Sequence, residues 1–277
     1  MPEFPGEAVY LWLFDDVRNA VQHGLFATGL DHFERTGRRE IELGLRKPLP
    51  RKTLSLKWLK GSGIEIGALH NPLSVYPEHA QVTYVDRLDV PALRQHYPEL
   101  ASTPLVPVGI IDDGEKLEAV ANDSQNFVIV NHVIEHTEDP IGALNTWFRV
   151  VRPGGMVYLG VPDKRYTFDR NRVNTPWLHM VADHEYGADG TRRQHFEEWV
   201  RYVGQHSEPD VVESMVAALM EQNYSIHFHV WDADSFSDFL VRYRDAYNPG
   251  FVMKDFEVCP EHSEIVFVLE KTQASVA

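Results

Sequence analysis

The stretch GSGIEIGALHNPLSVYPEHAQVTYVD, residues 61–86, contains two short apolar runs joined by a turn. The first run ends at Glu65-Ile66-Gly67, the chain breaks at His70-Asn71-Pro72, and the second run ends on Asp86. A strand, a glycine turn, a second strand and a terminal carboxylate are typical of the first half of a nucleotide-type α/β site. Gly67 lacks a Cβ, so the backbone can approach a ligand closely there. Asp86 is placed where a carboxylate can accept from two ribose hydroxyls.

Outward from this stretch, short apolar runs alternate with helical periodicity as far as residue 162. The first five predicted strands cover residues 63–67, 82–86, 105–109, 126–131 and 155–161. Short, continuous, β-branched runs are typical of strands buried on both faces, and their alternation with helices predicts parallel pairing. Two later strands, 251–258 and 263–271, are only a few residues apart, which predicts an antiparallel hairpin. The expected fold class is α/β, with a doubly wound, Rossmann-like and mostly parallel seven-stranded sheet.

Two helices are expected between the first five strands, over residues 90–100 and 139–155. In the second, Asp139 is a capping residue, Pro140 suits the first turn, and Arg152-Pro153-Gly154-Gly155 is expected to end the helix.

Two segments fall outside this alternation. Residues 1–57 place apolar side chains at helical intervals, and the basic, proline-broken run at 46–58 reads as a linker. We expect 1–57 to be a helical extension that packs on the core, covers the ligand cleft or forms a homodimer contact. Residues 163–225, rich in His, Arg, Trp and Glu, are predicted to be a helical lid insertion within a main domain at 58–277.

The composition narrows the function classes. The formal net charge of -15 argues against a nucleic-acid partner, which requires a basic footprint. An acidic surface suits a cationic ligand, although solvation alone also accounts for such a charge. Cys259 is the only cysteine, so a reducing compartment is expected. The absence of an apolar run of about 18 residues predicts no membrane span and a soluble cytoplasmic protein.

The motifs together resemble a class I S-adenosylmethionine-dependent methyltransferase. The matching segments are IEIGA and YVD, IIDDGEKL after the third strand, and NFVIVNHVIEHTEDPIGALNTWFRVVRPGGMVYLGVPD. Three further segments, PDKRYTFDR, RRQHFEEWV and YSIHFHVW, resemble a bacterial subgroup associated with polysaccharide and glycan biosynthesis. The first motif departs from the family pattern, because Ala68-Leu69-His70 follows Gly67 where further glycines are usual. Their loss also argues against a nicotinamide dehydrogenase, whose cofactor pyrophosphate needs close backbone approach.

The resemblance implies S-adenosyl-L-methionine as cofactor and S-adenosyl-L-homocysteine as product. Glu65 and Gly67 would shape the methionine end, Asp86 would take the ribose hydroxyls, and Asp112 or the backbone of Ile111 would meet the adenine. An alternative reading makes Asp112 an ordinary turn or capping residue. The full set of expected cofactor-binding residues is Glu65, Gly67, Ala68, Asn71, Asp86, Arg87, Ile111, Asp112, Asn131 and His132.

A sugar hydroxyl has a pKa far above 7, so methylating its oxygen calls for a general base. The candidates at strand ends or in the insertion are His132, Asp163, His227 and His229. His227 and His229 are two residues apart in a stretch expected to be extended, so we expect them to share one face. They could instead be metal ligands together with Asp163, or buried structural histidines. A divalent metal ion at this site is possible, but a mechanism without a metal is favoured.

The insertion also carries candidate acceptor-binding residues, namely Lys164, Arg165, Arg192, Arg193 and Trp231. Arginine could bind a phosphate or carboxylate of the acceptor in bidentate fashion. The alternative is that these cations pair with carboxylates inside the insertion.

The sequence therefore predicts O-methyl transfer to a sugar or glycan-type acceptor. Methylation of another small natural product, or a non-catalytic cofactor-binding or regulatory module with the same fold, remain the alternatives.

Overall fold

The computed structural model describes residues 1–247 and 249–272. The chain forms two compact units. The smaller contains Met1–Leu59 and Leu73–Ala80, and the larger contains Lys60–Pro72 and the chain from Gln81 onward.

The smaller unit is helical. Its helices are α1 (Glu7–Leu13), α2 (Asp15–Gln22), α3 (Gly29–His32), α4 (Arg38–Glu42) and α5 (Pro50–Trp58), with a π-helical turn at Phe33–Gly37. Its core consists of Tyr10, Phe14, Val17 and Phe33. The prediction of a proline-broken linker at residues 46–58 is wrong over most of this range, because residues 50–58 form the helix α5. Pro50 stands at the start of that helix, where its missing N–H costs nothing.

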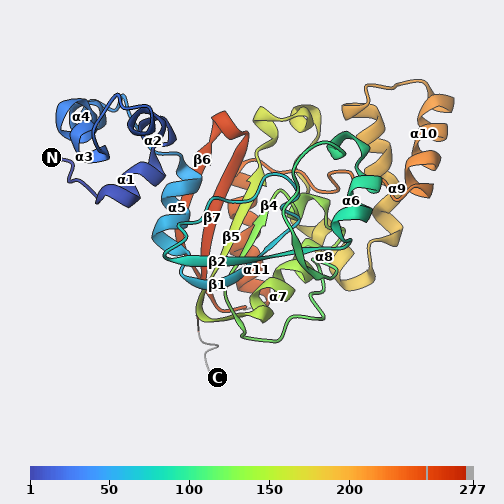
Figure 1. Ribbon diagram of the computed structural model, residues 1–277. Helices are drawn as coiled ribbons and strands as arrows, with labels where there is room; N and C mark the ends of the chain where they lie inside the picture. The colour runs from blue at the N-terminus through green and yellow to red at the C-terminus, as the bar shows by residue number, and fades with distance from the viewer. Residues whose placement is uncertain (248, 273–277) are drawn as a thin grey trace. The chain divides into compact units, whose positions relative to one another are not determined.

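The larger unit is built on a seven-stranded sheet (Figure 1). Its strands are β1 (Gly61–Ile66), β2 (Ala80–Asp86), β3 (Val108–Ile111), β4 (Gln125–Asn131), β5 (Val151–Pro162), β6 (Phe251–Cys259) and β7 (Glu264–Lys271). Their order across the sheet is β3-β2-β1-β4-β5-β7-β6. The seven-stranded, Rossmann-like α/β fold is thus confirmed. The sheet is mixed, since β7 runs antiparallel to both β5 and β6.

Two strands, β3 and β5, start three or more residues away from the predicted position, each for a local reason. β3 starts at Val108 rather than residue 105, directly after Pro107, which has no N–H to donate to a ladder. β5 starts at Val151, so the preceding helix α7 (Pro140–Val150) ends earlier than expected. Val151 pairs with Gln125 of β4. Asp139 caps α7 by accepting from Gly142 N, as predicted.

Helices α6 (Val90–His96), α7 and α11 (Ala233–Tyr247) complete the α/β part. One large core joins α7 and α11 to the apolar runs of β4, β5 and β7, in which residues 127–130, 157–161 and 265–269 are buried. The continuous runs in the sequence correspond to these fully covered strands.

The insertion after β5 contains α8 (Trp177–Tyr186), α9 (Asp189–Glu198) and α10 (Pro209–Glu221), and Figure 1 shows α9 and α10 side by side. Short helical turns lie at Lys164–Tyr166 and Phe168–Asn171, and a π-helical turn at Trp199–Val203. Phe196, Val216 and Phe228 contribute to a separate small core here. Residues 224–230 form no strand, and Trp231 makes only an isolated bridge with Asp163.

Within residues 1–247 and 249–272, no helix combines the length and the apolar character needed to cross a membrane.

Candidate functional site

A cleft of about 700 Å³ opens where β1, β2, β3 and β4 end in the larger unit. Parallel strands bring their carboxyl ends to one edge of a sheet, and ligands of open α/β folds bind in the crevice outside that edge. Five of the predicted site residues line the cleft, namely Gly67, Asp86, Arg87, Asp112 and His132. These five residues lie at or directly after the ends of β1 to β4.

Gly67 follows β1 with a φ of 65°, in the left-handed region that favours glycine. Its N–H donates to Val85 O (2.9 Å), which fixes the turn against β2. A Cβ at this position would lie 3.3 Å from Val133 Cγ2. The backbone therefore forms a bare wall of the cleft that a side chain would narrow.

Asp86 and Arg87 lie at the end of β2. The Arg87 N–H donates to Asp86 Oδ1 (2.8 Å), and the Arg87 guanidinium contacts His96 Nε2 and Tyr97 Oη. Burial raises the pKa of Asp86, although the neighbouring Arg87 opposes the change. A partly buried carboxylate at this edge gains from ligand hydroxyls that replace its lost water.

Asp112 follows β3 and has a clear local role. Its Oδ1 accepts from Asp113 N (2.8 Å) and its Oδ2 accepts from Ala119 N (2.7 Å). It therefore holds the turn, as the alternative reading of the sequence proposed, while still lining the cleft.

The other expected cofactor-binding residues do not line the cleft; they are Glu65, Ala68, Asn71, Ile111 and Asn131. Glu65 is buried and accepts from Asn131 Nδ2 at 3.4 Å, so these two side chains meet beneath the strand ends. Asn71 N donates to Ala68 O within the turn after β1. Ile111 is exposed at the end of β3.

Glu115 is a member of the cleft that the sequence reading passed over. Burial, followed by the carboxylates of Asp113, Glu138 and Asp139, raises the pKa of Glu115 to about 7. Glu115 belongs to the motif IIDDGEKL, which indicated that this segment lies near the ligand. The sequence alone does not show which of the three acidic residues in the motif would have a raised pKa. The side chains that line the cleft thus include four carboxylates and one arginine, namely Asp86, Asp112, Asp113, Glu115 and Arg87.

His132 directly follows β4 and adopts an uncommon backbone conformation, with a φ of 53°. Its N–H donates to Gly160 O (2.8 Å), which holds it beside β5. His132 Nε2 lies 3.1 Å from Glu264 Oε2, and Nδ1 lies 3.7 Å from Glu135 Oε1. A non-glycine residue in this region stores strain that often marks a functional position.

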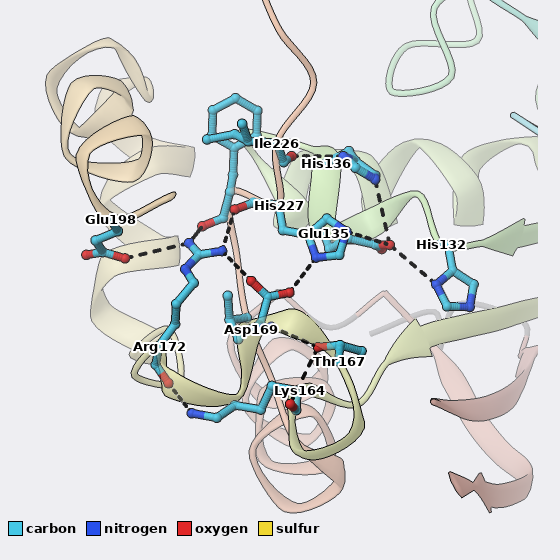
Figure 2. A network of polar contacts seen from close by, with 12 residues as sticks. His132, Glu135, His136, Lys164, Thr167, Asp169, Arg172, Glu198, Ile226 and His227 are labelled. Atoms are coloured by element: carbon cyan, nitrogen blue, oxygen red, sulfur yellow. Dashed lines mark hydrogen bonds and ion pairs between the residues drawn. The ribbon is translucent and has the colours of Figure 1, made fainter. Parts of the chain in front are cut away.

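Figure 2 shows the polar network that continues from His132. Glu135 is buried, and Oε1 lies 3.9 Å from both His136 Nε2 and His227 Nε2. Among the described residues, neither Glu135 carboxylate oxygen has a hydrogen-bond partner. His136 lines the cleft, which the sequence reading did not predict.

The outer part of the network orients both histidines. His136 Nδ1 lies 2.8 Å from Ile226 O, and His227 Nδ1 lies 2.6 Å from Asp169 Oδ2. Burial alone would raise the pKa of Asp169, but His227 and Arg172 together lower it. Both histidines therefore present Nε2 to Glu135.

The remaining base candidates lie elsewhere. Asp163 is fully buried and accepts from the backbone and side chain of Arg165. His229 is fully buried as well, and burial lowers its pKa well below the usual value. His227 and His229 belong to different side-chain groups, so the structure does not bring them together as expected. Residues 227–229 form no regular strand, and the alternation of its two faces is lost.

The candidate acceptor-binding residues are engaged within the insertion and its surroundings. Lys164 Nζ donates to Arg172 O, Arg165 pairs with Asp163, Arg192 pairs with Glu138, and Arg193 pairs with Glu197 and Glu213. Trp231 is 1% exposed and stacks on Phe239 in the main core, so it presents no open ring face.

Comparison with known proteins gives one family match. A family model described as methyltransferase domain matches residues 52–242, and no curated protein matches the sequence. Similar solved structures include a S-adenosylmethionine-dependent methyltransferase from Methanosarcina mazei, with 15% identity over 82% of this chain and 99% of that one, at a TM-score of 0.42. The CurJ carbon methyltransferase has 13% identity over 78% of this chain and 49% of its own length, at a TM-score of 0.39. This chain thus spans about half of that protein. A Pyrococcus horikoshii OT3 protein has 16% identity over 78% of this chain and 84% of its own length, at a TM-score of 0.40.

Proposed function

The chain belongs to the methyltransferase-domain family, which implies S-adenosyl-L-methionine as cofactor, and from this premise we propose that it methylates an oxygen of a sugar or glycan-type acceptor. The observation that carries the proposal is the acidic cleft at the ends of β1 to β4, with His132 on its wall.

The residues of the cleft fit such a cofactor. Asp86 would accept from the ribose hydroxyls, and the bare backbone at Gly67 leaves room that a Cβ would fill. The carboxylates of Asp86, Asp112 and Glu115 favour a cationic ligand over a neutral one. When bound, the cofactor supplies a sulfonium-activated methyl group, so that the protein's main tasks are positioning and proton removal.

His132 is the general base in this proposal. The Glu264 carboxylate accepts from Nε2–H and so fixes the tautomer, leaving the ring's lone pair on Nδ1. As the acceptor hydroxyl attacks, Nδ1 takes its proton. The imidazolium that forms lies between the carboxylates of Glu135 and Glu264, which stabilise its charge.

A second candidate mechanism uses a divalent cation at Glu135, His136 and His227. One ligand atom from each of the three lies within 4.8 Å of the others, and both Glu135 oxygens lack a hydrogen-bond partner among the described residues. Ile226 O and Asp169 orient the two imidazoles from behind, which is the usual support of metal-binding histidines. A cation here would bind the acceptor hydroxyl and lower its pKa.

The choice of a sugar acceptor rests on the resemblance of residues 162–170, 192–200 and 224–231 to glycan methyltransferases. It gains support from Phe168 and Trp199, whose rings lie 4.8 and 5.7 Å from the His227 ring. Phe168 is about half exposed, and an exposed aromatic face next to polar groups is suited to a sugar ring.

The experiment has two stages. S-adenosyl-L-homocysteine is first titrated calorimetrically into the protein, and labelled methyl transfer is then measured with nucleotide sugars and oligosaccharides, with and without chelator. Binding followed by transfer to a hydroxyl supports the proposal. No binding, or transfer only to nitrogen, carbon or sulfur acceptors, overturns it. A loss of turnover on chelation that Mg²⁺ restores selects the metal-assisted mechanism, and unchanged turnover selects His132 acting without a metal.

A further inference from the structure

A second group of potential ligands lies in the larger unit, outside the residues that line the cleft. It consists of His179 and Asp183 of α8, His195 of α9 and His229 of the segment before α11. One ligand atom from each of the four lies within 4.8 Å of all the others. Three separate segments of the chain therefore converge on one point.

The packing around the group aims these side chains inward. His179 and Asp183 are four residues apart on α8, so they share one face of the helix. Thr191 Oγ1 donates to Asp183 Oδ1 (2.6 Å), which leaves Oδ2 turned toward His179 Nε2 at 3.1 Å. His229 Nε2 lies 3.3 Å from Glu138 O, so this nitrogen carries the proton and Nδ1 has the lone pair. Outer partners of this kind orient metal ligands.

The group leaves buried polar atoms unsatisfied. Asp183, His195 and His229 are each at least 96% buried. Asp183 Oδ2, which lies 3.1 Å from His179 Nε2, and His229 Nδ1 have no hydrogen-bond partner among the described residues. Buried polar atoms without partners are rare in native proteins because each costs free energy. A ligand bound at this point would supply the partners that Asp183 Oδ2 and His229 Nδ1 lack.

The spacing fits a small cation. His179 Nε2 and His195 Nε2 lie 3.0 Å apart, with Asp183 Oδ2 3.1 Å from His179 Nε2. Zinc binds imidazole nitrogen at about 2.0–2.1 Å, so tetrahedral ligand atoms are roughly 3.3 Å apart. Mg²⁺ and Ca²⁺ prefer oxygen ligands, whereas three imidazoles and one carboxylate suit zinc and similar borderline metals.

We propose that His179, Asp183, His195 and His229 bind one divalent cation of the zinc type. Four protein ligands in a buried setting make a closed, structural site. The cation fixes α8 and α9 to the segment that carries His227, two residues before His229. It is distinct from the candidate centre at Glu135, His136 and His227, with which it shares no ligand.

The test uses untagged protein purified without chelator. Elemental analysis should find one zinc per chain, and chelator-treated protein should bind equimolar Co²⁺ with the visible absorption of a four-coordinate site. The chelated protein should also melt at a lower temperature, which added zinc restores. Wild-type protein that holds no zinc and gives no four-coordinate cobalt spectrum overturns the proposal.

Substitutions assign the site. Asp183→Asn keeps the shape of the side chain, and His179→Ala changes the least buried ligand; both should abolish the four-coordinate spectrum. Thr191→Val should weaken cobalt binding by roughly 10- to 100-fold, as loss of an outer partner does. Glu135→Gln and the exposed His262→Ala are the matched controls and should retain the spectrum. An unchanged spectrum in Asp183→Asn, or its loss in Glu135→Gln, would place the metal elsewhere.

Discussion

Arg172 carries a guanidinium group that is only 1% exposed. It donates to Asp169 Oδ1 (2.9 Å) and to the carbonyl oxygens of His227 (2.8 Å) and Phe228 (3.2 Å). Figure 2 shows that it connects the turn bearing Asp169 to the segment bearing His227. One buried guanidinium group therefore joins the turn that bears Asp169 to residues 227 and 228.

Arg172→Met removes that charge while keeping much of the side-chain volume. Asp169 then loses its guanidinium partner and keeps the contact with His227, and two buried carbonyls lose a donor. Removing one partner of a buried pair costs about 3–5 kcal/mol. In a protein of this size, each kcal/mol lost from the free energy of unfolding lowers the melting temperature by about 2–4 °C. We therefore expect the melting temperature of Arg172→Met to be lower by roughly 6–20 °C.

The assay is thermal and urea unfolding, with Arg170→Met as control. Arg170 lies in the same turn but is exposed, so its substitution should change the free energy of unfolding by less than about 0.5 kcal/mol. Equal losses in the two variants, or a loss below about 1 kcal/mol for Arg172→Met, would refute a net contribution from the buried pair.

The same network predicts a pH dependence. Since His227 and Arg172 lower the pKa of Asp169 in the folded protein, its contribution to stability is present above the unfolded pKa of about 4. That contribution is lost as the pH falls from there through the folded pKa. Asp169→Asn should lack this acid-sensitive component in urea titrations between about pH 2.5 and pH 6. An acid profile that matches wild type would contradict the assignment.

Three further predictions concern the cleft. Asp86→Asn should raise the Kd for S-adenosyl-L-homocysteine by roughly 10- to 100-fold, because a hydrogen bond to a charged group contributes about 1.5–3 kcal/mol; the exposed Glu118→Gln should not change it in the same calorimetric titration. His132→Gln should lower kcat by roughly 10²- to 10⁴-fold without changing that Kd, and an unaltered kcat would exclude His132 as the base. The pKa of Glu115, about 7, implies that the preference for the sulfonium cofactor over its neutral product rises between about pH 6 and pH 8. Glu115→Gln should flatten this rise, and an equal rise in the variant would place the titrating group elsewhere.

The sheet was largely predictable because β1, β4, β5 and β7 contain continuous, mainly apolar buried runs, bounded by glycine, proline and acidic residues. The turn at Gly67 and the carboxylate of Asp86 belong to one short stretch of sequence, and both residues line the cleft. The start of β3 was misplaced because apolar Leu105 and Val106 suit a strand, whereas pairing with β2 begins only after Pro107. The antiparallel hairpin of β6 and β7 was predicted and is confirmed. The pairing of β7 with β5 was not predicted, because periodicity within a strand does not reveal its neighbour in the sheet.

The partners of the histidines were the least predictable part. The sequence places His227 and His229 two residues apart, but a stretch without sheet pairing carries no alternation of faces. His227 meets Glu135 and Asp169, while His229 meets His179 and His195. Glu264 was hidden for a similar reason, since it is 132 residues from His132 in the chain. Contacts over such separations depend on tertiary packing rather than on local pattern.

The position of β7 has a consequence for biosynthesis. During vectorial translation β1 to β5 leave the ribosome well before Glu264, yet β5 has an unpaired edge until β7 adds to it. The sheet of the nascent chain is therefore incomplete until β7 is synthesised. Glu264, whose carboxylate contacts His132 Nε2, is the first residue of β7. The residues that line the cleft are all synthesised before Glu264, the carboxylate that lies beside His132. Because β7 lies between β5 and β6, the completion of the sheet and the placement of Glu264 beside His132 occur in the same late step.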